Sequence, residues 1–176
     1  MCSEHSNGDV MPMVIALGIR TEHWRALIRK FPCVLNCSVD VREALHKEWD
    51  ASHEGSGFDE HIRRRMKQKP TWTIVESVAM WILASFGLLL VVCKYGKHRS
   101  LSVGYEIAKV ADCELVSPRD RIQSVGLEGV DHFLARVDAR IRAHIKYFGE
   151  FNHPIEKIGI CNADFDGPAW MNSPGE

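Results

Sequence analysis

The sequence lacks the features of a secreted, membrane-spanning or strongly charged protein. Residues 1–12 are polar and show no basic start followed by an apolar run, so we expect a cytoplasmic location. Residues 77–92 carry no charge, but Gly87 divides this run and it falls short of the roughly 20 apolar residues that a membrane span needs. We therefore expect no membrane partner. Lys and Arg number 22 against 23 Asp and Glu, which excludes attraction of nucleic acid by overall charge.

A disulfide framework is not expected either, although the chain contains 6 cysteines. A cytoplasmic protein keeps its thiols reduced. Cys33 and Cys37 stand in an apolar run without a matching second pair, which favours buried core cysteines over a zinc site. Further candidate ligands follow in a polar stretch: His46, Glu48, Asp50, His53 and Glu54. Their spacing fits no known ligand pattern, so we expect a polar loop, no metal and no cofactor.

The sequence does contain an alternation of strand-like and helix-like segments. Strands are expected at residues 14–20, 33–39, 88–93 and 113–117. Helices are expected at residues 22–31, 58–69, 71–86, 99–111 and 127–148. This alternation predicts an α/β fold, a small three-layer domain with a parallel or mixed sheet covered on both faces. The 176 residues suit one domain at 13–150, after a disordered N-terminus at 1–12 and before an irregular tail at 151–176.

Two of the expected helices raise the question of partners. The helix at 127–148 presents one apolar stripe, for which docking on the sheet is favoured over oligomerisation. The helix at 58–69 carries Arg63, Arg64 and Arg65, for which a solvated face is favoured over contact with RNA. The tryptophans expected in the core are Trp24, Trp72 and Trp81. The histidines expected at the surface are His61, His132 and His144.

The most informative segment is VVCKYGKHRS, residues 91–100. A buried strand leads to Cys93, Gly96 permits a tight turn, and a helix begins near Arg99. Backbone N–H groups of such a loop point inward and the helix start leaves its first N–H groups unpaired, which together form an anion site. The Arg99 guanidinium can bind two oxygens of one phosphate. Further charge and hydroxyl groups come from Lys94, Lys97, His98, Ser100 and Ser102.

The position of this loop in the expected fold adds to its interest. Ligands of parallel sheets bind at the carboxyl ends of the strands. We therefore expect residues 93–100 to share one rim with residues 40–57 and 117–121.

The spacing Cys-x5-Arg-Ser, from Cys93 to Ser100, is also the signature of the Cys-dependent phosphatases. In that family the loop lowers the pKa of the thiol and the thiolate attacks phosphorus. On this hypothesis Cys93 is the nucleophile and Arg99 binds the charge of the transition state. The candidates for the general acid are Asp40, Asp50 and Asp59. Val92 stands where a His usually precedes the cysteine in that family.

A second resemblance covers more of the chain, roughly residues 14–121. GKHRS at 96–100 resembles the motif that opens a helix in the C-terminal domain of the RNase adapter protein RapZ. VDVREALHKEWD at 39–50, SGFD at 56–59 and ELVSPRD at 114–120 are similar to other segments of that family in order and spacing. Lys94-Tyr95 replaces the family's usual Thr-Gly, and Glu48 stands where the family has a pocket histidine.

The RapZ resemblance implies a binding domain that senses glucosamine-6-phosphate and engages a small RNA and partner proteins. Carried over by position, the residues that line its sugar-phosphate pocket are Cys93, Gly96, Arg99 and Ser100, with His98 and Arg42 nearby. The first hypothesis is therefore a non-catalytic module that binds a phosphorylated small molecule as a sensor or adapter. Its ligand-binding residues are Arg42, Cys93, Lys94, Tyr95, Gly96, Lys97, His98, Arg99 and Ser100. A Cys-dependent phosphatase is the second hypothesis and an RNA-binding module is the third.

Overall fold

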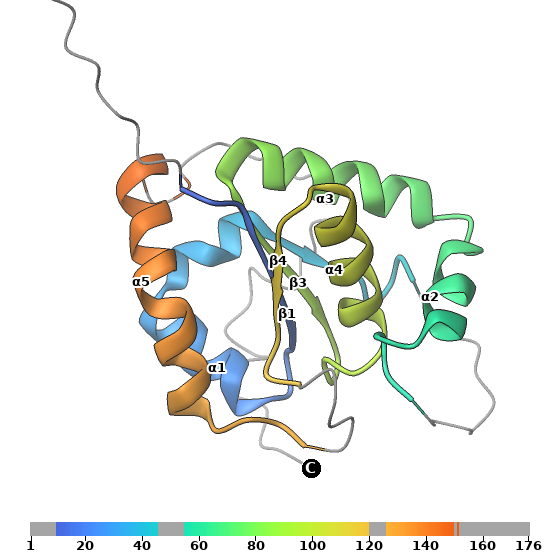
Figure 1. The fold of residues 1–176 in the computed structure, drawn as a ribbon, viewed down its shortest axis with the longest axis horizontal. Coiled ribbons are helices and arrows are strands. Elements are labelled where there is room, and N and C mark those ends of the chain that lie inside the picture. The colour runs from blue at the N-terminus through green and yellow to red at the C-terminus, as the bar shows by residue number, and fades with distance from the viewer. Residues whose placement is uncertain (1–9, 46–54, 120–125, 150, 152–176) are drawn as a thin grey trace, which may run out of the picture.

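The computed structural model describes residues 10–45, 55–119, 126–149 and 151. Its strands are β1 (Met13–Gly18), β2 (Ser38–Asp40), β3 (Leu88–Cys93) and β4 (Glu114–Val116). Its helices are α1 (Glu22–Lys30), the 3-10 helix η1 (Pro32–Cys37), α2 (Glu60–Lys67), α3 (Trp72–Phe86), α4 (Arg99–Val110) and α5 (Val130–Phe148). The strands form one parallel sheet in the order β2-β3-β1-β4 (Figure 1). The predicted α/β class and parallel sheet are confirmed.

The two central strands form the core of the molecule. Every residue of β1 and β3 is buried, since helices cover both faces of the sheet and leave no solvated side. Their register runs from Met13 opposite Leu88 to Gly18 opposite Cys93. The two strands therefore end side by side at the same edge.

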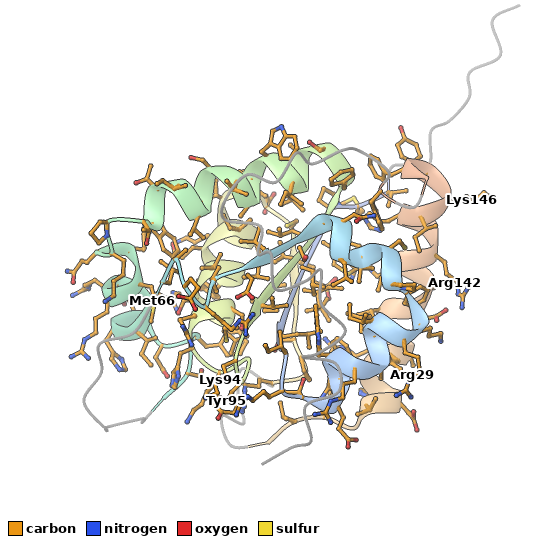
Figure 2. All side chains as sticks on the ribbon, turned by 180° about the vertical axis from the view of Figure 1, so that it is seen from behind. Arg29, Met66, Lys94, Tyr95, Arg142 and Lys146 are labelled. Carbon is orange, nitrogen blue, oxygen red and sulfur yellow. The ribbon has the colours of Figure 1, made fainter. Side chains whose placement is uncertain are left out.

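The connections of these two strands run over opposite faces of the sheet. The chain passes from β1 through α1 and η1 to β2, whereas it passes from β3 through α4 to β4 in the opposite direction. Because such parallel crossovers are right-handed, α1 and α4 lie on different faces. Figures 1 and 2, which show the molecule from opposite sides, agree with this arrangement. The domain thus has the predicted three layers.

Helix α5 docks on the domain through the predicted apolar stripe. Phe133, Val137 and Ile141 are buried, and α5 contacts α1. The helix begins at Val130, later than expected, because Gly129 occupies its N-cap position. The prediction of a surface His144 is wrong: the ring is buried and its Nε2 lies 3.0 Å from the carbonyl oxygen of Gly87. His144 lies on the apolar stripe of α5. A polar side chain can be buried there when a carbonyl group forms a hydrogen bond with it.

Two further expectations differ from the structure. Residues 33–39 are not one strand, since η1 occupies the first part and β2 begins only at Ser38. Pro32 at the first helical position fixes the backbone for a helical turn. Trp81 is 46% exposed, because the apolar residues of α3 extend beyond the face that the domain buries. Trp24 and Trp72 are buried, as expected.

The remaining expectations concern membrane, metal and termini. No helix in the described ranges is long and apolar enough to cross a membrane. Cys37 is buried, and this burial raises the pKa of its thiol, which disfavours the thiolate that binds metal. Across the same ranges no group of His, Cys, Asp and Glu side chains is placed to hold a metal ion. The candidate ligands at 46–54 and most of the expected N-terminal and C-terminal segments lie outside the described residues.

Candidate functional site

The loop between β3 and α4 turns its carbonyl groups outward. Each carbonyl from Cys93 to Lys97 accepts a hydrogen bond from a neighbouring segment. The carbonyl of Cys93 accepts from the N–H of Ile19 at 2.9 Å, and that of Lys94 accepts from the N–H of Arg20 at 3.1 Å. The carbonyl of Lys97 accepts from the N–H of Gly57 at 2.8 Å. The guanidinium of Arg119 donates to the carbonyls of Gly96 at 3.1 Å and Tyr95 at 3.5 Å. A trans peptide directs its N–H opposite to its carbonyl. The N–H groups that follow these carbonyls therefore point to the other side of the loop.

The turn at Gly96 gives the loop its concave form. Gly96 has a φ of 66°, in the left-handed region that glycine adopts without strain. Its N–H donates to Cys93 Sγ at 3.3 Å, so this amide points to the inner side of the loop. Helix α4 begins directly afterwards at Arg99, so its first amides, which have no partner within the helix, follow the loop. Successive inward N–H groups and a helix start are the parts of an anion-binding nest.

Cys93 lies at the base of this nest. The residue is 3% exposed, and its Sγ lies 3.2 Å from Oγ of the fully buried Ser100. The Ser100 hydroxyl and the Gly96 amide are donors that a thiolate accepts from. The thiol is thus held under the loop by contacts that suit either a bound anion above it or a thiolate.

Arg99 and Arg42 are fixed beside the loop by the end of β2. The Asp40 carboxylate accepts from the backbone N–H of Arg42 at 2.9 Å and from its Nε at 2.8 Å, with Nη2 at 2.6 Å. The carbonyl of Arg42 in turn accepts from Nη1 of Arg99 at 2.7 Å. The Asp40 side chain is fully buried and Arg42 is half-buried. The structure therefore brings the backbone of Arg42 to Arg99.

The segment before α2 supports the loop from outside. Gly57 donates to the carbonyl of Lys97, and His98 Nε2 lies 3.2 Å from the carbonyl oxygen of Gly55. A Cβ at Gly57 would lie 2.4 Å from the carbonyl oxygen of His98, so this contact requires glycine. His98 therefore contacts the supporting segment, and its role in ligand binding stays a prediction.

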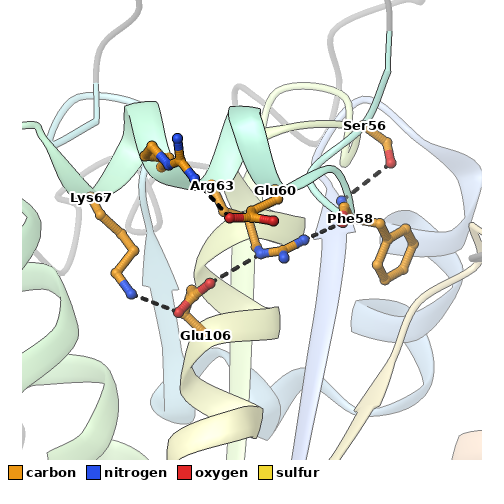
Figure 3. A network of polar contacts seen from close by, with 7 residues as sticks. Ser56, Phe58, Glu60, Arg63, Lys67 and Glu106 are labelled. Atoms are coloured by element: carbon orange, nitrogen blue, oxygen red, sulfur yellow. Dashed lines mark hydrogen bonds and ion pairs between the residues drawn. The ribbon is translucent and has the colours of Figure 1, made fainter.

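Helix α2 holds this supporting segment against α4. Glu106 of α4 receives Arg63 Nε at 3.0 Å and Lys67 Nζ at 2.9 Å (Figure 3). Arg63 also donates to the carbonyl of Phe58, whose N–H donates to Ser56 Oγ at 3.2 Å. Burial raises the pKa of Glu106, but the two cations outweigh this effect and the pKa lies below its ordinary value.

Lys94 and Tyr95 lie away from the nest, on the side of β1. Tyr95 is 52% exposed, and the Lys94 ammonium lies 5.1 Å from the centre of its ring. The guanidinium of Arg20, which follows β1, lies 5.9 Å from the same ring. The predicted loop residues are thus divided between an inner group around Cys93 and an outer group around Tyr95.

Sequence reasoning missed two cations at this site. Arg119 had been placed on the rim but not among the binding residues, and Arg20 had been counted only as the end of a strand. Burial lowers the pKa of Arg119, an effect that the nearby Cys93 opposes. Arg20 follows β1 and Arg119 follows β4. This position in the sequence could have indicated both residues, because all parallel strands of a sheet end at one edge.

The structure describes some of the other residues expected at the rim. Asp59 Oδ2 accepts from the backbone N–H of Ser56 at 2.6 Å, so this acid candidate caps its own loop. Asp50 lies outside the described residues. A groove of about 900 Å³ between α4, β4 and the start of α5 shares Arg119 with the loop.

Comparisons with protein-family models, with curated proteins and with solved structures each find no match for this chain. The resemblances to RapZ and to the Cys-dependent phosphatases therefore stay predictions, and the case for function depends on the geometry of residues 93–100.

Proposed function

We propose that residues 93–100 bind the phosphate group of a phosphorylated small molecule, and that the protein acts as a binding module, sensor or adapter. The observation that carries this proposal is the outward direction of the carbonyls from Cys93 to Lys97. It turns the amides of a glycine-containing loop and of a helix start toward one point. Arg99, held by the carbonyl of Arg42, supplies a bidentate cation beside that point.

A Cys-dependent phosphatase is the second candidate. The contacts of Cys93 Sγ with Ser100 Oγ and the Gly96 amide favour it, since both groups stabilise a thiolate. The acid candidates that the structure describes fit less well. Asp40 gives both carboxylate oxygens to Arg42, and Asp59 accepts from Ser56. A general acid needs a proton to donate, which such ion pairing opposes.

The RNA-binding hypothesis receives less support from helix α2. Arg63 and Lys67 pair with Glu106, and Arg64 pairs with Glu60. These cations are already engaged within the fold, which lowers the gain from contact with a phosphate backbone.

Thermal melting in the presence of phosphate, glucosamine-6-phosphate and p-nitrophenyl phosphate tests the proposal. A ligand at 100 times its Kd adds about 2.7 kcal/mol of stability, which raises the melting midpoint. We expect a raised midpoint without release of nitrophenol. The absence of any shift at millimolar phosphate would contradict phosphate binding.

The Cys93→Ser variant separates the two candidates in the same assay. A binding module keeps most of its phosphate affinity, because the amides and Arg99 are unchanged. A phosphatase loses its turnover, because the nucleophile is gone. Nitrophenol release by the wild type that disappears in Cys93→Ser would establish the enzyme in place of the binding module.

A further inference from the structure

The proposed phosphate site lies beside the adjacent ends of β1 and β3. The chain leaves these adjacent strands for opposite faces of the sheet, toward α1 and α4 (Figures 1 and 2). In open α/β sheets, ligands bind in the crevice at such a point. Arg20 follows β1 at this edge of the sheet, and Lys94 and Tyr95 follow β3. We call these three residues the crevice cluster.

The backbone fixes the crevice cluster in place. The N–H of Arg20 donates to the carbonyl of Lys94 at 3.1 Å, which continues the pairing of the two strands by one step. Below this contact, a Cβ added to Gly18 would lie 2.2 Å from the backbone of Tyr95. The two segments are therefore in direct contact, and their side chains project from adjacent positions at the edge of the sheet, where Figure 2 labels Lys94 and Tyr95.

The crevice cluster carries positive charge toward solvent. Within the described ranges, no carboxylate pairs with Arg20 or Lys94. The side chains instead flank the ring of Tyr95, at 5.9 Å and 5.1 Å. A hydrogen bond with Lys94 lowers the pKa of Tyr95, partial desolvation opposes this, and the charges of Lys94 and Arg20 lower it further. The Tyr95 phenol therefore lies in a locally positive environment.

A third cation strengthens this side of the loop. Arg119 donates to the carbonyls of Tyr95 and Gly96 and so lies against the same turn. Its guanidinium is bound only to neutral carbonyl groups in the contacts that the structure shows, so its charge is not cancelled. An anion near Tyr95 therefore meets the fields of three cations.

We propose, on the basis of the phosphate site above, that the crevice cluster binds a second anionic group, so that the ligand is a small molecule with two phosphate groups. One phosphate lies in the nest above Cys93 and the other lies on the surface beside Arg20, Lys94 and Tyr95. Arg20 binds two oxygens of the second phosphate, Lys94 contributes a point charge, and the Tyr95 hydroxyl donates a hydrogen bond.

An aromatic group stacked on Tyr95 is the competing occupant. Both cations lie near the ring, so such a group would have to displace a cation from it. A phosphate instead binds the cations where they lie. The second phosphate is therefore favoured, and the stacked group becomes an outcome of the test.

Calorimetric titration with matched ligands tests this inference at 0.15 M salt, where distant charges are screened. The probes are ribose 5-phosphate with ribose 1,5-bisphosphate, and fructose 6-phosphate with fructose 1,6-bisphosphate. The proteins are the wild type, Arg20→Gln, Lys94→Gln and the double variant. Arg29→Gln and Lys146→Gln serve as controls, because both cations are exposed and lie on other parts of the surface (Figure 2).

We expect at least one bisphosphate to bind the wild type about tenfold more tightly than its monophosphate partner. In the double variant this ratio falls to about twofold, the value expected from having two phosphates. The affinity for the monophosphate falls less than the affinity for the bisphosphate in every variant, because Arg99 and the loop amides are unchanged. The control variants keep the full ratio.

Three results would overturn the inference. Monophosphate binding with a ratio near twofold in the wild type would remove the second site while leaving the phosphate loop intact. A high ratio that survives in the double variant would place the second phosphate elsewhere. Tighter binding of p-nitrophenyl phosphate than of either bisphosphate would favour the stacked group. Absence of binding by all probes would instead contradict the phosphate loop itself, and the inference with it.

Discussion

Two clusters of cations on this protein differ in what neutralises them. Between α2 and α4, Arg63 and Lys67 share the carboxylate of Glu106, which is 11% exposed (Figure 3). At the crevice cluster, Arg20 and Lys94 flank an aromatic ring, and the structure shows no carboxylate paired with them in the ranges it describes. The first cluster joins two helices, whereas the second faces solvent beside a loop with inward amides.

The comparison separates charge that stabilises the fold from charge available to a ligand. Burial of the Glu106 carboxylate costs free energy, which its ion pairs with Arg63 and Lys67 offset. Loss of any one of these three side chains therefore leaves a poorly solvated charge. Arg20 and Lys94 of the crevice cluster form no ion pair of this kind within the described residues. Substitutions at the two clusters are therefore expected to divide into effects on stability and effects on binding.

The largest effect on stability is expected at Gly18, which packs against the backbone of Tyr95. In Gly18→Ala, the new Cβ would lie 2.2 Å from the backbone of Tyr95 and 2.5 Å from that of Gly96. Because backbone atoms must move, we expect a loss of about 3 kcal/mol and weaker phosphate binding. Chemical denaturation measures the change. Gly126→Ala is the control, since its Cβ would meet nothing within 4 Å. Equal stability of both variants would contradict the close contact between β1 and the loop.

The next effect is expected at the paired cluster. Glu106→Gln keeps the shape of the side chain but removes the charge that Arg63 and Lys67 share, so we expect a loss of about 1–2 kcal/mol. Glu60→Gln is the control, because its ion pair with Arg64 is exposed and contributes less than about 1 kcal/mol. If the two variants melted at the same temperature, Glu106 would not be the connection between α2 and α4.

The pH dependence of stability follows from the same carboxylate. The pKa of Glu106 in the folded protein lies below its ordinary value of 4.5. The stabilisation is therefore present above that value and is lost as the pH falls through the lower pKa of the folded state. We expect denaturation curves between pH 6 and about pH 3 to show this loss in the wild type and a smaller loss in Glu106→Gln. Parallel pH profiles of the two proteins would contradict the assignment.

The smallest effect on stability is expected at the crevice cluster. Arg20→Gln and Lys94→Gln remove charges that no carboxylate in the described ranges balances, so stability stays within about 0.5 kcal/mol of the wild type. The same denaturation assay checks this. A loss as large as that of Glu106→Gln would show that the two clusters do not differ, and the comparison would fail.

The sequence was most informative where local chemistry decides the structure. The uncharged run LLLVVC predicted β3 with its observed bounds, and Gly96 predicted a tight turn, in which its φ is 66°. The register of β1 against β3 follows from neither pattern, although it sets Arg20 against Lys94. Contacts between distant segments of this kind depend on the packing of the whole domain.

Apolar segments without a clear period were the main source of error. CVLNC fits a buried strand or a helical turn equally, and Pro32 decided for the turn. The apolar residues of α3 extend beyond its buried face, so their periodicity could not show that Trp81 faces outward. His144 was assigned to the surface by its polarity, whereas the carbonyl of Gly87 supplies its partner inside the domain. Arg20 was overlooked as a site residue because it lies far from the loop in the sequence.

The central claim is that the amides of residues 93–100 and Arg99 bind phosphate, and titration of inorganic phosphate into Arg99→Ala tests it most directly. Arg29→Ala is the matched control, because that arginine is exposed on the last turn of α1. We predict that calorimetry finds phosphate binding to the wild type and to Arg29→Ala, and a loss of at least about tenfold in Arg99→Ala. Equal phosphate affinity in all three proteins would contradict the account.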